Sequence, residues 1–226
     1  MTSSLLQASS LTRRFTRPTG EAVTAVDHLD ITLVPGELVA VTGPSLSGKT
    51  AVVDLLAGWA QPDDGTVVWG EAPSPPPWSY LTVVPQAFAL LEELTVRENI
   101  LLAGRFDRGS RNGRNPSHDA EHLEALLGRL GLDRLQERGA FEISVGERQR
   151  TMVARALVGR PQVVLADDPV AHQDRRHADV VFELLREAVD GGAACLVATR
   201  SPSIAEIADR VITLGAAARP PESAGG

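Results

Sequence analysis

Three features that many proteins contain are scarce in this sequence. Cysteine occurs once, at Cys195, so no disulfide can form within the chain, and this suits a reducing compartment. Aromatic residues make up only 4% of the 226 residues. No run of about 18 apolar residues occurs, and the N-terminal stretch MTSSLLQASSLTRRF has no apolar segment typical of a signal peptide. We therefore expect a chain that reaches a membrane only through a partner.

An excess of positive charge is also missing. The chain has 22 Lys and Arg against 29 Asp and Glu, which gives a net charge of −7. Because binding to nucleic acid favours a basic surface, we expect no nucleic-acid partner. The arginines of residues 105–114 lie among glycine and asparagine, and we interpret this segment as a solvent-exposed loop. A site for anionic lipid or for a partner is the alternative.

The hydrophobic content of 43% is sufficient for one large core. Helical patterns alternate with short apolar runs, which lie at 37–43, 65–70, 81–86, 161–169, 194–199 and 210–214. Such alternation predicts an α/β protein with a mainly parallel sheet covered on both faces. The stretch from about 92 to 159 contains helical patterns without strands, so we predict a helical subdomain inserted into a single domain of residues 1–215. Residues 216–226 have the composition of a disordered tail.

The clearest motif is GPSLSGKT, which follows one apolar run and precedes a helical pattern. In a glycine-rich turn that leads into a helix, backbone N–H groups point into one concavity and attract phosphate oxygens. A lysine here adds a charge that reaches the β- and γ-phosphates, and the following threonine offers a hydroxyl to Mg²⁺. The motif predicts a nucleotide-binding loop formed by Gly43, Pro44, Ser45, Leu46, Ser47, Gly48, Lys49 and Thr50.

Two further patterns suggest chemistry beside this loop. Asp167 and Asp168 close the apolar run VVLADD, and ligands of open α/β sheets bind at the carboxyl ends of strands. An aspartate at that position can hold the Mg²⁺ that bridges nucleotide phosphates. Ser144 and Glu147 form a capping-box pattern around Gly146, which predicts a helix N-terminus that attracts an anion.

The segment ISVGERQRTMVARALVGRP resembles the signature motif of ABC transporter ATPases, usually Leu-Ser-Gly-Gly-Gln/Glu followed by Gln-Arg and Ala-Arg-Ala-Leu. The resemblance covers nearly the whole chain. LTRRF is similar to the A-loop of that family, VVPQAFALLEELTVRENI to its Q-loop segment, DDPVAHQD to Walker B with the D-loop, and VATRSPS to its switch segment. The chain is most similar to the group that serves LolD-, MacB- and FtsX-like permeases. The resemblance implies a P-loop NTPase fold with an N-terminal antiparallel β segment.

The resemblance also implies roles for individual residues. Phe15 would stack on adenine, while Ser144, Gly146 and Glu147 would contact the ATP held by the opposite subunit of a dimer. The implied metal ligands are Thr50, Gln86 and Asp167, and the implied catalytic residues are Asp168, Gln86 and Arg200. ATP and Mg²⁺ are the implied cofactors.

Four residues depart from the family pattern. Leu46 and Val145 replace glycines, which predicts backbone strain wherever those glycines use angles that favour glycine. Asp168 replaces the catalytic glutamate and is one methylene shorter, so an attacking water would be poorly placed for it. Arg200 replaces the switch histidine and cannot exchange a proton near neutral pH. We expect nucleotide binding together with weakened hydrolysis.

The resemblance implies an ATP-binding subunit of an ABC transporter. As a homodimer or a heterodimer with a related ATPase, it would bind Mg-ATP at the dimer interface and couple hydrolysis to an integral-membrane permease. It would then be cytoplasmic and peripheral on the inner face of the cell membrane. The alternative is a non-hydrolysing or regulatory subunit, such as the silent half of a heterodimer. A P-loop kinase is a third interpretation, but it would not need the element at 144–157.

Overall fold

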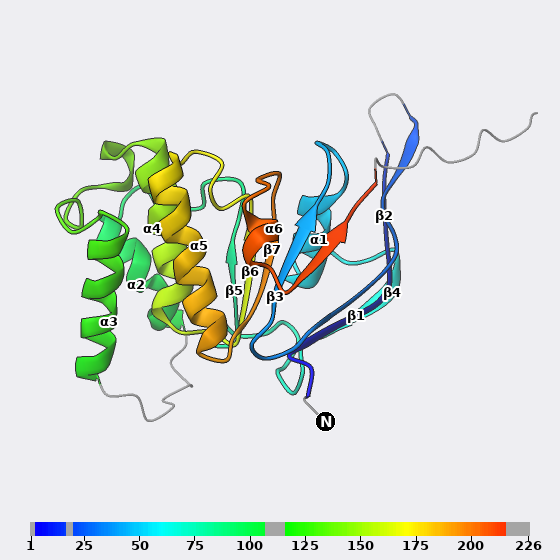
Figure 1. Ribbon diagram of the computed structural model, residues 1–226, viewed down its shortest axis with the longest axis horizontal. Coiled ribbons are helices and arrows are strands. Elements are labelled where there is room, and N and C mark those ends of the chain that lie inside the picture. Colours follow the sequence, from blue (N-terminus) through cyan, green and yellow to red (C-terminus); the bar gives the residue numbers. More distant parts are fainter. Residues whose placement is uncertain (1–2, 17–19, 107–115, 216–226) are drawn as a thin grey trace, which may run out of the picture.

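The computed structural model describes residues 3–16, 20–106 and 116–215, and these form two sheets with helices between and beside them (Figure 1). The predicted tail at 216–226 and most of the predicted arginine-rich loop lie outside the described residues. No helix in the described part of the chain is both long and apolar enough to cross a membrane.

The smaller sheet is antiparallel and has the order β2-β1-β4. Its strands are β1 (Leu6–Thr16), β2 (Ala22–Leu33) and β4 (Asp64–Val68). The N-terminal antiparallel segment is therefore confirmed. The apolar run at 65–70 pairs antiparallel with β1 and takes no part in the parallel sheet.

The larger sheet is parallel and has the order β5-β6-β7-β3-β8. Its strands are β3 (Leu38–Thr42), β5 (Leu81–Val84), β6 (Val163–Asp167), β7 (Ala194–Ala198) and β8 (Arg210–Thr213). Because parallel strands end at the same edge, the segments that follow β3, β6 and β7 come together there. This edge carries the site described below.

The faces of the parallel sheet follow the two-residue period of its strands. Along β3, Val39 and Val41 pack with α1 (Lys49–Leu56) and the antiparallel sheet, whereas Leu38 and Ala40 pack on the other side. Figure 1 shows α1 on the side of the antiparallel sheet and the longer helices on the opposite side. These longer helices are α2 (Val96–Phe106), α3 (Pro116–Arg129), α4 (Val145–Val158) and α5 (Arg175–Asp190).

Between β5 and β6 the described residues form α2, α3, the short 3-10 helix η1 (Ala140–Glu142) and α4, with no strand among them. A capping box opens α2, because the Glu98 amide donates to Thr95 Oγ1 (3.2 Å) and the Thr95 amide donates to Glu98 Oε2 (3.0 Å). A stripe of leucines along α3 and just after its last residue is buried in one cluster: Leu123, Leu126, Leu127 and Leu130. A last short helix, α6 (Ile204–Ile207), follows β7.

Candidate functional site

The loop of residues 43–48 joins β3 to α1, as the motif predicts. Gly43 has φ +156°, and a Cβ there would lie 2.6 Å from Ser47 Oγ and 2.7 Å from Leu214 O. Gly48 has φ +92°, and a Cβ there would lie 2.0 Å from Ala25 O. Both positions therefore exclude any side chain. Their close packing holds the loop in the conformation that leads its backbone into the N-terminus of α1.

Leu46 occupies a backbone conformation that favours glycine, with φ +65°. Its side chain is 87% exposed, so the leucine adds strain without a steric clash inside the loop. The strain predicted for Leu46 is therefore present. The condition for strain is not met at Val145, because Val145 is the first residue of α4 and is absent from the described residues with positive φ.

We expect Leu46→Gly to raise the free energy of unfolding by about 0.5–1 kcal/mol, because relief of left-handed strain exceeds the cost of ordering a more flexible backbone. Leu46→Ala is the matched control. It removes the same exposed side chain but keeps a Cβ at the strained angle, so its stability should stay near that of the wild type. Urea denaturation followed by circular dichroism measures both. Equal midpoints for the two variants would contradict the strain argument.

Lys49 is the first residue of α1, and its side chain folds back onto this loop. Its Nζ donates to Gly43 O (3.0 Å) and Pro44 O (2.8 Å) and lies 3.4 Å from Ser47 Oγ. Burial, together with the positive charge of Arg200, lowers the pKa of Lys49 below its usual value. The loop therefore holds a partly desolvated cation at the place where phosphate oxygens would enter.

Three side-chain oxygens gather at the carboxyl end of β6. The Thr50 hydroxyl donates to Gln86 Oε1 (3.3 Å), and Asp167 is 3% exposed. Burial raises the pKa of Asp167 above its usual value, while the neighbouring Thr50 hydroxyl opposes that shift. Asp167 Oδ2 is buried and accepts no hydrogen bond, which is costly for a carboxylate unless a further ligand satisfies it. Carboxylate, hydroxyl and amide oxygens of this kind suit a hard divalent cation.

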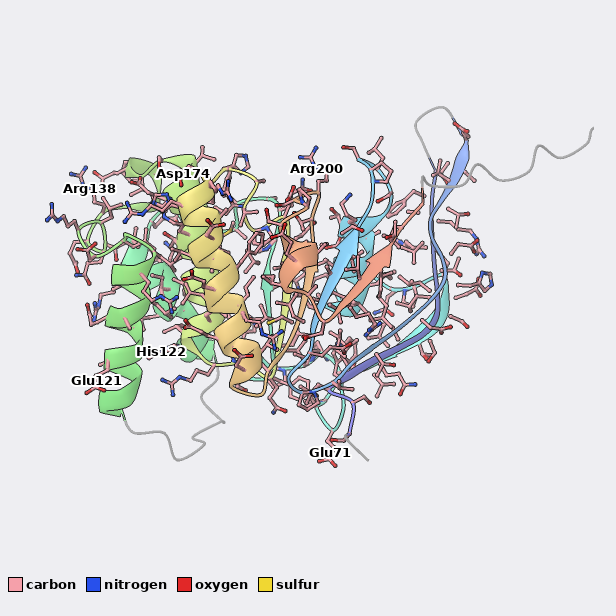
Figure 2. All side chains as sticks on the ribbon, viewed as in Figure 1. Glu71, Glu121, His122, Arg138, Asp174 and Arg200 are labelled. Atoms are coloured by element: carbon pink, nitrogen blue, oxygen red, sulfur yellow. The ribbon has the colours of Figure 1, made fainter. Side chains whose placement is uncertain are left out.

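Asp168 lies directly beside this group and is 8% exposed. Its backbone has φ +48°, and its amide donates to Ala198 O (2.7 Å) at the end of β7. Arg200 Nη2 lies 3.7 Å from Asp168 Oδ2, and Arg200 Nη1 lies 3.5 Å from Ser45 Oγ. Figure 2 shows Arg200 at the edge of the sheet where its strands end. The structure thus brings the two replaced catalytic positions into direct contact with each other and with the loop.

The predicted second anion site has the expected local geometry. Ser144 is the N-cap of α4, its amide donates to Glu147 Oε2 (2.7 Å), and its hydroxyl accepts from the Glu147 amide (3.3 Å). The Ser144 amide also holds the pKa of Glu147 below its usual value. A Cβ at Gly146 would lie 3.0 Å from His172 O. Since α4 and α1 cover opposite faces of the sheet, this site is separate from the loop at 43–48 within one chain.

Phe15, the predicted adenine-stacking residue, lies near the end of β1 and is 46% exposed. The Arg13 guanidinium carbon lies 5.0 Å from the centroid of its ring. Among the described residues, no hydrogen bond or ring contact joins Phe15 to residues 43–50, so its role stays a prediction.

Sequence analysis missed two buried polar side chains of this site. Gln149 Nε2 donates to the backbone oxygen of Asp168 (2.8 Å), and Gln149 Oε1 accepts from the His172 amide (3.1 Å). Thr199 donates to the Asp168 carboxylate and is fully buried. Gln149 links α4 to the segment after β6. The glutamine of the QR pair, a polar residue in an otherwise apolar helical face, was the available signal.

The fold and the site define a nucleotide-binding protein of the P-loop class. The model of the ABC transporter family matches residues 26–171. The lipoprotein-releasing system ATP-binding protein LolD of Idiomarina loihiensis is 35% identical, over 95% of this chain and 96% of that protein. The ABC transporter ATP-binding protein YxdL of Bacillus subtilis is 32% identical, over 83% of this chain and 75% of that protein. The dimeric structure of MJ0796, a bacterial ABC transporter cassette, covers 93% of this chain and 94% of its own, with a TM-score of 0.80 and 23% identity.

The chain belongs to the ABC transporter family, as an ATP-binding subunit with the ATPase activity of that family. Its resemblance to LolD-type proteins is confirmed. The comparisons do not favour the alternative of a non-hydrolysing regulatory subunit. The relatives are named as ATP-binding proteins of transport systems. One structural neighbour of this chain, at 24% identity, is a post-hydrolysis state of MJ0796 bound to ADP and Pi.

Proposed function

We propose that the chain binds Mg-ATP at the edge of its parallel sheet and couples ATP hydrolysis to an integral-membrane permease. The observation that carries the proposal is the orphaned oxygen of Asp167, which lies in the same group as Thr50 and Gln86 beside the Lys49 loop. Residues 43–50 would bind the phosphates through backbone N–H groups and Lys49. Phe15 would stack on the adenine, with Arg13 held against its ring.

Thr50, Gln86 and Asp167 fit a magnesium ion. Each would contribute an oxygen, and Asp167 would contribute the charge that a buried metal needs. Among the described residues, no three His, Cys, Asp or Glu side chains form a metal-binding group. A cation here would therefore be coordinated by phosphate oxygens of the nucleotide as well as by these protein oxygens. When bound, it would neutralise the charge that develops on the phosphates during hydrolysis.

We further propose a dimer in which Ser144, Gly146 and Glu147 of one subunit meet the ATP of the other. Two points support it. The capped N-terminus of α4 is an anion site that lies apart from the loop of its own chain. In addition, the structural neighbour with the TM-score of 0.80 is dimeric.

A hollow of about 680 Å³ beside the Gln86 segment is the surface that we assign to the permease. Trp59 and Trp78 line it and are 60% and 42% exposed. Pro85 and Ala89, on either side of Gln86, line it as well. A partner segment seated here would reach the chain next to a proposed metal ligand, and the inserted helices of residues 92–159 would pass the motion on. A permease of the MacB or FtsX type would place the subunit on the inner face of the cell membrane.

Turnover tests this proposal. The purified chain is expected to release phosphate from Mg-ATP slowly, and Asp168→Glu should raise the rate by about tenfold or more, within the range that a positioned general base supplies. Asp168→Asn is the control with no base, and it should reduce the rate to background. A continuous phosphate assay measures all three. Absence of nucleotide binding and of phosphate release in every variant would overturn the proposed function.

A further inference from the structure

The two oxygens of the Asp168 carboxylate have different neighbours. Oδ1 accepts a hydrogen bond from Thr199 Oγ1 (2.8 Å), whereas Oδ2 lies 3.7 Å from Arg200 Nη2. Both neighbours come from the segment that follows β7, although that segment lies 31 or more positions away along the chain. Neither contact follows from the motif that contains Asp168.

Thr199 fixes the orientation of the carboxylate. Its hydroxyl oxygen accepts from the Ser201 amide (3.0 Å), which directs the hydroxyl hydrogen toward Asp168 Oδ1. The Asp168 backbone is held as well, since its amide donates to Ala198 O and its oxygen accepts from Gln149 Nε2. The Thr199 hydroxyl therefore occupies Oδ1, and only Oδ2 remains to take a proton.

Arg200 screens that second oxygen. Its side chain is 61% exposed and extends from Asp168 to Ser45 Oγ, so the guanidinium lies between the base and the phosphate-binding loop. An exposed pair at this distance is weak. The phosphate oxygens of a nucleotide offer a guanidinium stronger, charge-assisted hydrogen bonds than this contact does.

We propose that Thr199 and Arg200 form a latch on Asp168: Thr199 keeps Oδ1 oriented, and Arg200 covers Oδ2 until the terminal phosphate of ATP draws the guanidinium away. The proposal rests on the function proposed above and adds a regulation of the same site. Thr199 is a positioning residue, whereas Arg200 exchanges one anion for another. ADP lacks the terminal phosphate, so it leaves the latch closed.

Release of the latch permits hydrolysis in a defined way. Oδ2 of Asp168 takes a proton from the attacking water, and the water oxygen forms a bond to the γ-phosphorus. The bond between the γ-phosphorus and the bridging oxygen breaks, and its electron pair remains on ADP. Because the Arg200 guanidinium then binds the terminal phosphate, it no longer competes with the water proton for Oδ2.

A double-mutant cycle on nucleotide affinity tests the exchange. The four proteins are the wild type, Asp168→Asn, Arg200→Gln and the double variant, each titrated by calorimetry with Mg²⁺ and either adenylyl imidodiphosphate or ADP. In the background that keeps Arg200, Asp168→Asn should tighten binding of the triphosphate analogue by roughly fivefold. In the Arg200→Gln background, the same substitution should tighten it by less than about twofold. With ADP the two backgrounds should give the same change, because no terminal phosphate is present.

Additive effects on the triphosphate analogue, with ADP affinity intact, would overturn the latch and leave the proposed function standing. Loss of ADP and triphosphate binding from all four proteins would overturn the proposed function itself. Arg129→Gln removes one arginine from another exposed ion pair, with Glu183 on α5, and should leave all affinities unchanged.

The Thr199 half of the latch is tested by two substitutions. Thr199→Val keeps the shape but removes the hydroxyl, and it should lower kcat by about tenfold with KM for ATP changed by less than about twofold. Thr199→Ser restores the hydroxyl and should recover most of kcat. A general packing defect would instead affect the serine variant, which loses a methyl group. Unchanged kcat in Thr199→Val would overturn the positioning role.

Discussion

Lys49→Ala is expected to weaken binding of Mg-ATP by about 2–4 kcal/mol, or roughly 30- to 900-fold, the scale for removing one partner of a buried charge pair. The ammonium lies within the loop at 3.0 Å and 2.8 Å from the oxygens of Gly43 and Pro44, so its loss leaves those groups facing the phosphates without a compensating cation. Calorimetry measures the affinity. Lys49→Arg keeps the charge and is the matched control, so it should lose less.

The chain offers a second test of the same assignment. Lys49 is its only lysine. Its lowered pKa leaves more of the neutral, reactive amine at a given pH than an ordinary lysine has. Acetylation with an amine-selective reagent should therefore modify one side chain, and Mg-ATP should protect it. Equal ATP affinity in the wild type and Lys49→Ala, or equal acetylation with and without ATP, would contradict the assignment of this loop.

Ser144→Arg is expected to abolish ATP-induced association while leaving the affinity of a single chain for ATP near that of the wild type. The Ser144 hydroxyl and amide are engaged with Glu147 at the start of α4, and nothing at this helix end contacts the loop of its own chain among the described residues. In the proposed dimer this end meets the terminal phosphate of the opposite nucleotide, where a bulky side chain blocks approach.

The measurement is analytical ultracentrifugation with and without ATP, on chains that carry Asp168→Asn so that hydrolysis does not undo the dimer. Glu121→Arg introduces the same bulky cation on α3, far from the edge of the sheet in Figure 2, and should leave association intact. Association that survives Ser144→Arg would exclude the start of α4 from the interface. A wild-type chain that stays monomeric at saturating ATP would count against a homodimer and favour a heterodimer.

Features set by neighbouring residues were predictable from the sequence. The loop GPSLSGKT between a strand and a helix is a local pattern, as are the two capping boxes, in which the partners are three residues apart. The buried stripe of α3 and the alternate faces of β3 follow from helical and strand periodicity. Local patterns of this kind predicted the fold class, the phosphate-binding loop and Asp167, because each depends on spacing that the chain itself fixes, whereas Gln86 was implied only by the resemblance to ABC ATPases.

Features that join distant segments were decided by the tertiary structure alone. The pairing of β4 with β1 depends on long-range register, and a short apolar run carries no information about which sheet it enters. The helical backbone of Val145 shows that a glycine in a family motif need not mark a strained angle. The contacts of Asp168 with Thr199 and Arg200 exist because β6 and β7 are neighbours in the parallel sheet and end at the same edge. Sheet order, which local propensity does not encode, thus determines how the carboxylate that we propose as the base is held.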